Sequence, residues 1–269
     1  MTRTAAAATP LTHRLAALAR PLVVAHRGLS SRFPENTLPA FEAAIACGAE
    51  LIELDVHTTR DGAVVCIHDE TLDRTTDARA VFGRGDVAVA DVDAAQIARL
   101  DAGSWRGAEH AGARVPTLEA TVRGAGDRIV LMIEHKRGDP ALLVAELRRL
   151  GVAERVFVQS FDWDTVAAVG RLAPEITLGA LGEGELSPAR LAAIDALGVA
   201  LVHWHHRDLR LADLGALHAR GYLSCVYTAD GELELFGRIR AGLGAVTTNR
   251  ADHLLALRRA ESGLRPTPR

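Results

Sequence analysis

Acidic side chains alternate with apolar ones in the run LIELDVHTTRDGAVVCIHDE, which covers residues 51–70. Successive side chains of a β-strand point to opposite faces, so Glu53, Asp55 and His57 share one face of a predicted strand. Two carboxylates side by side in a partly dry site repel each other strongly unless a positive charge lies between them. This spacing therefore indicates a cation-binding site rather than an ordinary core strand.

The run IVLMIEHK at residues 129–136 supplies a third carboxylate by the same alternation, because Glu134 and Lys136 share one face. Oxygen ligands suit a hard divalent cation, so we expect Glu53, Asp55 and Glu134 to hold one Ca²⁺ or Mg²⁺ ion. Zinc is disfavoured because no thiol is close in sequence and the neighbouring histidines have better uses.

The elements that must position these groups follow a regular rhythm of short apolar runs and longer stretches with helical periodicity. The predicted strands are residues 22–25, 50–56, 129–133, 155–158, 176–180, 199–203, 222–226 and 244–247. The predicted helices are residues 37–47, 117–124, 139–150, 162–172, 187–197, 209–219, 231–240 and 250–260. Strands that are each followed by a helix favour closure into a (β/α)8 TIM barrel. An open doubly wound sheet is the alternative, disfavoured because no Gly-rich dinucleotide loop follows a strand.

Polar residues stand at the ends of most predicted strands, and in such a barrel the active site forms at the carboxyl ends. These residues are His26, Arg27, Glu53, Asp55, His68, Asp69, Glu134, Lys136, Gln159, Ser160, His203, Tyr227, Thr228, Thr248 and Asn249. An exposed edge strand or a satisfied core histidine would explain any one of them alone. Their joint placement at one rim favours a functional site.

The predicted domain organisation is a barrel domain at residues 21–260, preceded by an N-terminal extension at residues 1–20. The extension either packs as a helix against the bottom of the barrel or stays loose. An insertion of about residues 69–116 follows the second strand at the C-terminal face, because the connection there is far longer than usual. The turn before residues 63–67 predicts a hairpin arm that carries His68 to the same rim. The polar tail at residues 261–269 is predicted to be disordered.

Composition argues against several classes of partner. The chain has 269 residues, a net charge of -3 and few aromatic side chains, which disfavours nucleic-acid binding. Cys47, Cys66 and Cys225 have neither disulfide nor zinc spacing and are expected to be reduced. No apolar run reaches the roughly 18 residues of a transmembrane segment. No signal-peptide pattern is present either, so the expected location is the cytoplasm.

The order of the motifs resembles that of the glycerophosphodiester phosphodiesterase family. HRG, PENT, E-x-D, HD and LDRTT occur in the family order within residues 23–77. The match continues through LDAGSW at 100–105, VPTLEA at 115–120, IEHK at 133–136 and QSFD at 159–162. The resemblance implies a TIM barrel with an insertion after the second strand. It also implies metal-dependent hydrolysis of glycerophosphodiesters to an alcohol and glycerol 3-phosphate.

Carried over motif by motif, the resemblance makes Glu53, Asp55 and Glu134 the metal ligands and His26 and His68 the catalytic acid–base pair. Two histidines that titrate near neutrality suit a base on the attacking oxygen and an acid on the leaving oxygen. The resemblance also allows a first attack by the neighbouring glycerol hydroxyl, giving a cyclic phosphate that water then opens. Which histidine acts first stays open.

The same carry-over places Arg27 and Lys136 on the substrate phosphate, with Gln159 and Tyr227 as further substrate-binding residues. A phosphodiester anion needs cationic partners that strengthen as charge builds on its oxygens, and these two side chains and the metal supply them. Glu35 either orients one of the histidines or is a plain charge at a helix N-terminus.

The chain departs from the family pattern at two strand ends. Tyr227 stands where the family usually has Trp, and Asn249 stands where an Asp is frequent, which leaves the size of the alcohol pocket open. The segment HWHH at residues 203–206 matches no family motif. We expect it to be a loop that lines the leaving-group pocket, since a second metal site there would lack a carboxylate.

Three alternative functions remain at this stage. The first is a lysophospholipase D-type activity of the same enzyme class, acting on lysophospholipids. The second is a metal-independent phospholipase C-like barrel, which would have no use for three rim carboxylates. The third is a non-catalytic phosphate-binding protein, which the complete set of histidines, cations and carboxylates argues against. The head group, the preferred ion and the oligomeric state are not predicted.

Overall fold

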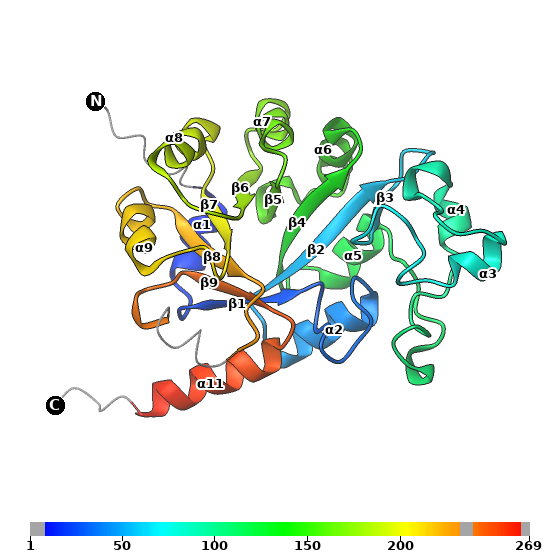
Figure 1. Ribbon diagram of the computed structural model, residues 1–269, viewed down its shortest axis with the longest axis horizontal. Helices are drawn as coiled ribbons and strands as arrows, with labels where there is room; N and C mark the ends of the chain where they lie inside the picture. The colour runs from blue at the N-terminus through cyan, green and yellow to red at the C-terminus, as the bar shows by residue number, and fades with distance from the viewer. Residues whose placement is uncertain (1–8, 232–238, 265–269) are drawn as a thin grey trace.

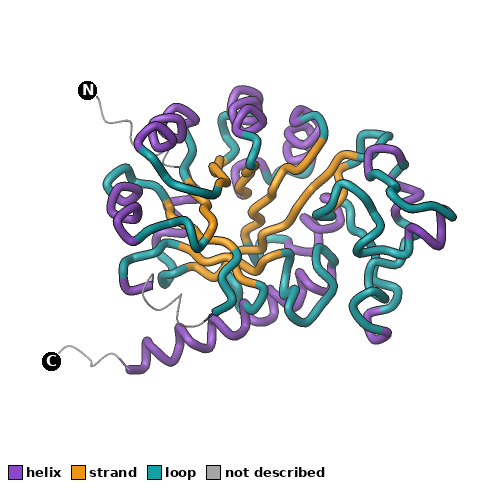
Figure 2. The backbone as a smooth tube through the Cα atoms, viewed as in Figure 1, coloured by secondary structure: helices purple, strands orange, loops and turns teal. Residues whose placement is uncertain are grey.

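Eight parallel strands close into a barrel in the computed structural model, which describes residues 9–231 and 239–264 (Figure 1). The barrel strands are β1 (Leu22–His26), β2 (Leu51–Thr58), β4 (Val130–Arg137), β5 (Val156–Ser160), β6 (Thr177–Gly182), β7 (Leu201–His205), β8 (Leu223–Tyr227) and β9 (Ala245–Thr248), and the short strand β3 (Val64–Cys66) is added to the edge of β2. Strand β1 pairs in parallel with both β2 and β9, which closes the ring. Figure 2 shows this ring of strands inside a layer of helices. The predicted (β/α)8 TIM barrel is confirmed.

Both faces of the barrel strands are covered, which explains why their sequences are so apolar. Outward-facing residues such as Ile52, Leu54 and Ile133 belong to one large core with the surrounding helices. Inward-facing residues at the amino ends of the strands, among them Leu51 and Met132, form a second core. Polar side chains take the inward-facing positions at the carboxyl ends, where the candidate site lies.

The described helices that follow the barrel strands lie close to the predicted limits, whereas α1, α3 and α4 had no predicted limits. The described helices are α1 (Pro10–Ala16), α2 (Leu38–Cys47), α3 (Ala78–Phe82), α4 (Ala94–Ile97), α5 (Leu118–Ala125), α6 (Pro140–Arg149), α7 (Trp163–Leu172), α8 (Pro188–Leu197), α9 (Leu211–His218) and α11 (Ala251–Leu264). The predicted helix at 231–240 falls largely outside the described residues. Helix α11 continues to Leu264, so residues 261–264 are helical and the prediction of a disordered tail is wrong for them. Residues 265–269 lie outside the described part.

Helix α1 covers the amino ends of the strands. Thr9 caps this helix, and Leu11 and Leu15 are buried in the same core as Leu22 and Phe157 from the barrel interior. Residues 10–16 therefore pack against the bottom of the barrel, at the end opposite the candidate site. In residues 9–231 and 239–264, no helix is long and apolar enough to cross a membrane.

The insertion follows the hairpin of β2 and β3. Strand β3 runs antiparallel to β2, with Val56 opposite Cys66, which confirms the predicted hairpin arm. Between β3 and α5 the chain forms α3, α4 and two 3₁₀ turns around a small core of its own, which includes Leu72 and Ile97. The insertion lies on the β2–β3 side of the barrel (Figure 1). Because this core is separate, it gives the residues that follow His68 a fixed platform.

Candidate active site

A cavity of about 350 Å³ opens at the carboxyl ends of the barrel strands. The predicted site residues that line it are His26, Arg27, Glu53, His68, Glu134, Lys136, Gln159 and Tyr227. They come from five barrel strands, from the turn after β1 in the case of Arg27 and from the segment after β3 in the case of His68. Asp55 lies beside them, paired in register with Glu134 across the β2–β4 ladder. The structure therefore brings together all nine residues that the sequence singled out.

Three buried carboxylates form a compact cluster in this cavity. Glu53, Asp55 and Glu134 each offer an oxygen within 4.8 Å of the others, and each residue is at most 8% exposed. Two of their oxygens, Glu53 Oε2 and Asp55 Oδ1, are buried and accept no hydrogen bond within the described residues. A buried carboxylate oxygen without a hydrogen bond is costly. Lys136 Nζ lies 3.9 Å from Asp55 Oδ1, beyond hydrogen-bond distance, so the two oxygens remain able to bind a further positive group.

The pKa values of the three carboxyl groups also favour an additional positive charge in the cluster. Burial and then the neighbouring charge of Asp55 raise the pKa of Glu134 to about 7 and that of Glu53 well above its ordinary value. Burial opposes ionisation of Asp55 as well, but Arg27, His68 and Lys136 hold its pKa below the ordinary value. The three groups can all be ionised at neutral pH only with additional positive charge. All-oxygen ligands fit a hard divalent cation such as Ca²⁺ or Mg²⁺.

His26, the last residue of β1, stands beside this cluster. Its Nε2 lies 3.9 Å from Glu53 Oε2, and its Nδ1 lies 2.7 Å from Asn249 Oδ1. Burial, followed by the charge of the adjacent Arg27, lowers the pKa of His26 to about 4. The ring is therefore neutral at physiological pH, with one nitrogen directed to the carboxylates.

His68 approaches from the hairpin that leads into the insertion. Its Nδ1 donates to Asp69 Oδ1 over 2.6 Å, and Lys136 Nζ lies 3.4 Å from its Nε2. His57 donates from Nε2 to the backbone carbonyl of His68 over 3.0 Å, so it supports the hairpin. The sequence assigned no role to His57 beyond sharing the face of the carboxylates.

Arg27 is held by a turn that few residues can adopt. Arg27 and Gly28 have positive φ angles of 55° and 84°, and a Cβ on Gly28 would lie 2.6 Å from the backbone of Ala40. The turn directs the guanidinium to Asp55, with Nε 3.1 Å from Oδ2, and to Glu35, with a hydrogen bond of 2.8 Å. Glu35 thus binds a cation rather than orienting a histidine directly.

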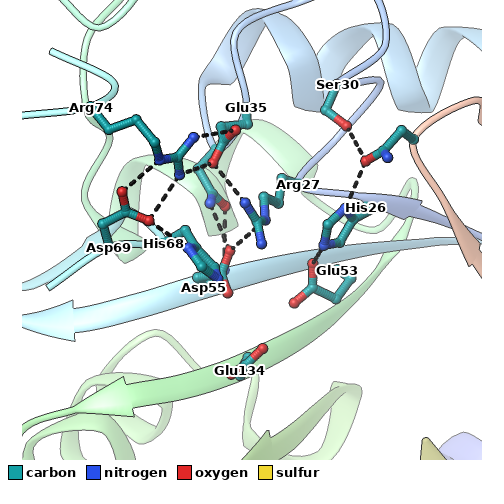
Figure 3. A network of polar contacts seen from close by, with 12 residues as sticks. His26, Arg27, Ser30, Glu35, Glu53, Asp55, His68, Asp69, Arg74 and Glu134 are labelled. Atoms are coloured by element: carbon teal, nitrogen blue, oxygen red, sulfur yellow. Dashed lines mark hydrogen bonds and ion pairs between the residues drawn. The ribbon is translucent and has the colours of Figure 1, made fainter. Parts of the chain in front are cut away.

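Arg74 from the insertion completes the arrangement (Figure 3). It donates two hydrogen bonds to Glu35 and two to Asp69, the carboxylate that holds His68. These hydrogen bonds keep the pKa of Asp69 below its ordinary value. Arg74 has no predicted role, although it lies within the LDRTT motif, which is the sequence signal that points to it.

The floor and far wall of the cavity contain a second polar chain. Lys136 Nζ donates to Glu134 Oε1 over 2.8 Å. Gln159 Oε1 accepts from His203 Nδ1, and His203 Nε2 accepts from Thr247 Oγ1, each over 2.9 Å. The Gln159 side-chain nitrogen is buried and makes no hydrogen bond within residues 9–231 and 239–264. It is a donor available to a bound molecule.

Most of the HWHH segment is strand rather than the predicted loop, although His203 and His205 do line the cavity as expected. Residues 203–205 belong to β7, and alternation sends His203 into the barrel and Trp204 outward into the core. Burial lowers the pKa of His203 to about 3, so this histidine stays neutral. Tyr227 packs edge-on against His203 and Phe161, with ring centroids 5.0 Å and 5.9 Å apart. These rings form the aromatic wall of the cavity.

Comparison with known proteins supports a single family. A sequence model of the glycerophosphoryl diester phosphodiesterase family matches residues 26–253. A glycerophosphodiester phosphodiesterase of Caldanaerobacter subterraneus is 33% identical over 246 residues, covering 88% of this chain and 98% of the relative. A glycerophosphodiester phosphodiesterase of Bacillus subtilis is 32% identical over 255 residues, covering 87% and 85%.

Solved structures agree with the sequence relatives. A phosphodiesterase of Oleispira antarctica, in complex with the product sn-glycerol-3-phosphate, is similar with a TM-score of 0.79 and 27% identity, over 88% of this chain and 96% of that one. A glycerophosphodiester phosphodiesterase of Agrobacterium tumefaciens has a TM-score of 0.74 and 30% identity, over 87% and 98%. The chain belongs to the glycerophosphoryl diester phosphodiesterase family.

Proposed function

We propose that the protein hydrolyses glycerophosphodiesters to an alcohol and glycerol 3-phosphate in the 350 Å³ cavity, using one divalent cation with His26 and His68 as the acid–base pair. The observation that carries this proposal is that two histidines, the cationic side chains of Arg27 and Lys136, and three buried carboxylates meet at one cavity. In Figure 3, His26 and His68 lie on either side of Arg27. A base and an acid on opposite sides of a phosphate are what in-line displacement requires.

The buried acidic cluster is the proposed site of the cation, held by Glu53, Asp55 and Glu134. The two carboxylate oxygens without hydrogen bonds and the raised pKa of Glu134 support this assignment. A bound Ca²⁺ or Mg²⁺ ion would supply positive charge to the phosphoryl oxygens as negative charge develops on them.

The polypeptide contributes the remaining groups. Arg27 and Lys136 bind the phosphate oxygens and interact more strongly as charge builds there. One histidine accepts the proton of the attacking oxygen, which belongs to water or to the neighbouring glycerol hydroxyl, while the new P–O bond forms. The other donates a proton to the alcohol oxygen while the old P–O bond breaks, so that the departing group leaves as a neutral alcohol. After attack by the glycerol hydroxyl, water opens the cyclic phosphate in a second displacement.

Two further residues bind the rest of the substrate. The free side-chain nitrogen of Gln159 supports a hydrogen bond to a substrate oxygen, because a buried donor without an acceptor is costly. Tyr227 donates its hydroxyl hydrogen to the Gly182 carbonyl over 3.0 Å, which leaves its ring face as the contact surface. A hydrogen-bond donor on the floor of the cavity and an aromatic wall suit a substrate that joins a small polyol to an alcohol group.

A panel assay tests the proposal. Glycerophosphocholine, glycerophosphoethanolamine, glycerophosphoglycerol and lysophosphatidylcholine are incubated with the enzyme in Ca²⁺, Mg²⁺, Mn²⁺ or EDTA. Release of glycerol 3-phosphate that EDTA abolishes and one ion restores is the expected result. Undiminished activity in EDTA contradicts the metal requirement, and release of lysophosphatidic acid alone favours the lysophospholipase D-type alternative.

A further inference from the structure

The ring of His26 is hydrogen-bonded to a side-chain amide rather than to a carboxylate. Its Nδ1 lies 2.7 Å from Oδ1 of Asn249, the residue after β9. The hydroxyl of Ser30 donates to the same Oδ1 over 2.9 Å. Figure 3 shows His26 and Ser30 pointing toward one shared oxygen. His68 differs, because its Nδ1 faces the carboxylate of Asp69.

Asp230 determines which way the amide of Asn249 points. Asn249 Nδ2 lies 2.7 Å from Asp230 Oδ2. The other carboxylate oxygen of Asp230 accepts from the backbone N–H of Asn249 over 2.9 Å and from the hydroxyl of Thr248 over 2.7 Å. A carboxylate accepts hydrogen bonds but does not donate them, so the amide nitrogen must face Asp230. The amide oxygen must then face His26.

This orientation decides the tautomer of His26. An amide oxygen is an acceptor only, so the hydrogen bond to it requires a proton on Nδ1 of the ring. A neutral imidazole carries one proton, which leaves Nε2 as the acceptor. That nitrogen is the one that faces the cavity beside Glu53.

We infer that Asn249, oriented by Asp230, is a positioning residue that fixes the Nδ1–H tautomer of His26 and leaves Nε2 as the atom that exchanges a proton with the substrate. The kinetic consequence rests on the proposed catalytic role of His26. When Nε2 takes up a proton, the ring becomes an imidazolium, and the amide cannot accept the Nδ1 proton. The imidazolium therefore returns the Nε2 proton in the next step, and the Nδ1–H bond stays intact throughout.

The variant Asp230→Asn separates orientation from packing. Its amide oxygen can still accept from Thr248 and from the backbone of Asn249, but its amide nitrogen would face that of Asn249. The Asn249 amide is expected to rotate and present a donor to His26, which moves the ring proton to Nε2. We expect kcat on glycerophosphocholine to fall about 10²-fold or more with KM within threefold of the parent value, the scale of a lost general base.

The double variant Asp230→Asn with Asn249→Asp is the rescue. The amide at position 230 then donates to the carboxylate at position 249, which again accepts from His26 Nδ1. We expect kcat at least tenfold above that of Asp230→Asn. The control is Asp195→Asn, which removes a carboxylate that binds Tyr222 and Arg220 outside the cavity. Its melting temperature is expected to fall with kcat unchanged.

Nitrogen NMR of histidine-labelled enzyme reads the tautomer directly, with the His26 signals identified by their loss in His26→Gln. We expect a proton on Nδ1 in the parent enzyme at pH 8 and on Nε2 in Asp230→Asn. A proton on Nε2 in the parent, or a double variant no better than a folded Asp230→Asn, would overturn the inference. If the tautomer moves and kcat does not, the positioning stands and the catalytic role of His26 fails.

Discussion

Arg74 and Glu35, 39 positions apart in the chain, form a two-pronged ion pair at the rim of the cavity, with N–O distances of 2.7 Å and 3.1 Å. Each partner also holds a residue of the candidate site. Glu35 accepts from Arg27 over 2.8 Å, and Arg74 donates to Asp69, which in turn binds His68. The insertion is thereby connected to both Arg27, the proposed phosphate-binding residue, and His68, one of the two proposed catalytic histidines.

Replacing Arg74 by Ala is expected to lower kcat/KM for glycerophosphocholine by about 10- to 100-fold, or about 1.4 to 2.7 kcal/mol of transition-state stabilisation. The reason is that Glu35 and Asp69 lose the cation that fixes them, so Arg27 and His68 gain freedom. Steady-state kinetics measures the effect. Arg60→Ala is the matched control, because Arg60 binds Asp93 with two hydrogen bonds at an exposed place. Equal losses in the two variants would contradict the prediction.

Replacing either His26 or His68 by Ala is expected to reduce release of glycerol phosphate by about 10²- to 10⁴-fold, because each removes an acid or a base. Circular dichroism should show an intact fold, since neither side chain belongs to the apolar cores. His13→Ala, at the opposite end of the barrel, serves as the control. Full activity in either site variant would refute the acid–base assignment.

The contribution of Glu134 to the stability of the metal-free protein is expected to fall as the pH rises from about 4.5 to 7. Folded Glu134, with its pKa raised to about 7 by burial, keeps a proton that the unfolded chain has released above its ordinary value of 4.5. At this group the folded state binds more protons, so the unfolding free energy of the parent falls relative to that of Glu134→Gln by about 3 kcal/mol. Glu53, whose pKa is also raised, contributes with the same sign in both proteins. His26 and His203, whose pKa values burial lowers, contribute with the opposite sign, and they do so equally in both proteins.

Urea unfolding of the parent and of Glu134→Gln in EDTA at a series of pH values measures this difference. Saturating Ca²⁺ or Mg²⁺ should remove the Glu134 contribution to the pH dependence of the parent if the cluster binds the ion, because the bound ion keeps the carboxylates ionised in the folded state. A difference between parent and variant that is constant from pH 4 to pH 8 would count against the buried cluster as described.

The variant Gly28→Ala is expected to destabilise the fold by about 3 kcal/mol or more and to disorder the Arg27 turn. Its φ of 84° costs a residue with a side chain about 1–2 kcal/mol, and the new Cβ would meet the Ala40 backbone at 2.6 Å. Gly112→Ala has a similar φ of 88° with nothing within 4 Å, so it isolates the conformational cost. Similar melting temperatures for the two variants would show that the close contact does not matter.

Local sequence patterns determined much of the fold and part of the site. Apolar runs of strand length predicted the eight barrel strands because strands buried on both faces need continuous apolar residues. The two-residue period predicted that Glu53 and Asp55 share one face of their strand, and that Glu134 and Lys136 share one face of theirs. The (β/α)8 pattern then predicted that these faces meet, because parallel barrel strands present their carboxyl ends at one rim.

Only the tertiary structure decided which side chains hold the proposed catalytic groups. His26 and Asn249 are 223 positions apart, and they meet because β1 pairs with β9 when the ring closes. Arg74 reaches Glu35 because the insertion folds back on its own core beside the β2–β3 hairpin. Strand β7 extends to His205, two residues beyond the predicted strand end at residue 203, so His205 lines the cavity together with His203. Such contacts depend on strand register and barrel closure, which no local periodicity encodes.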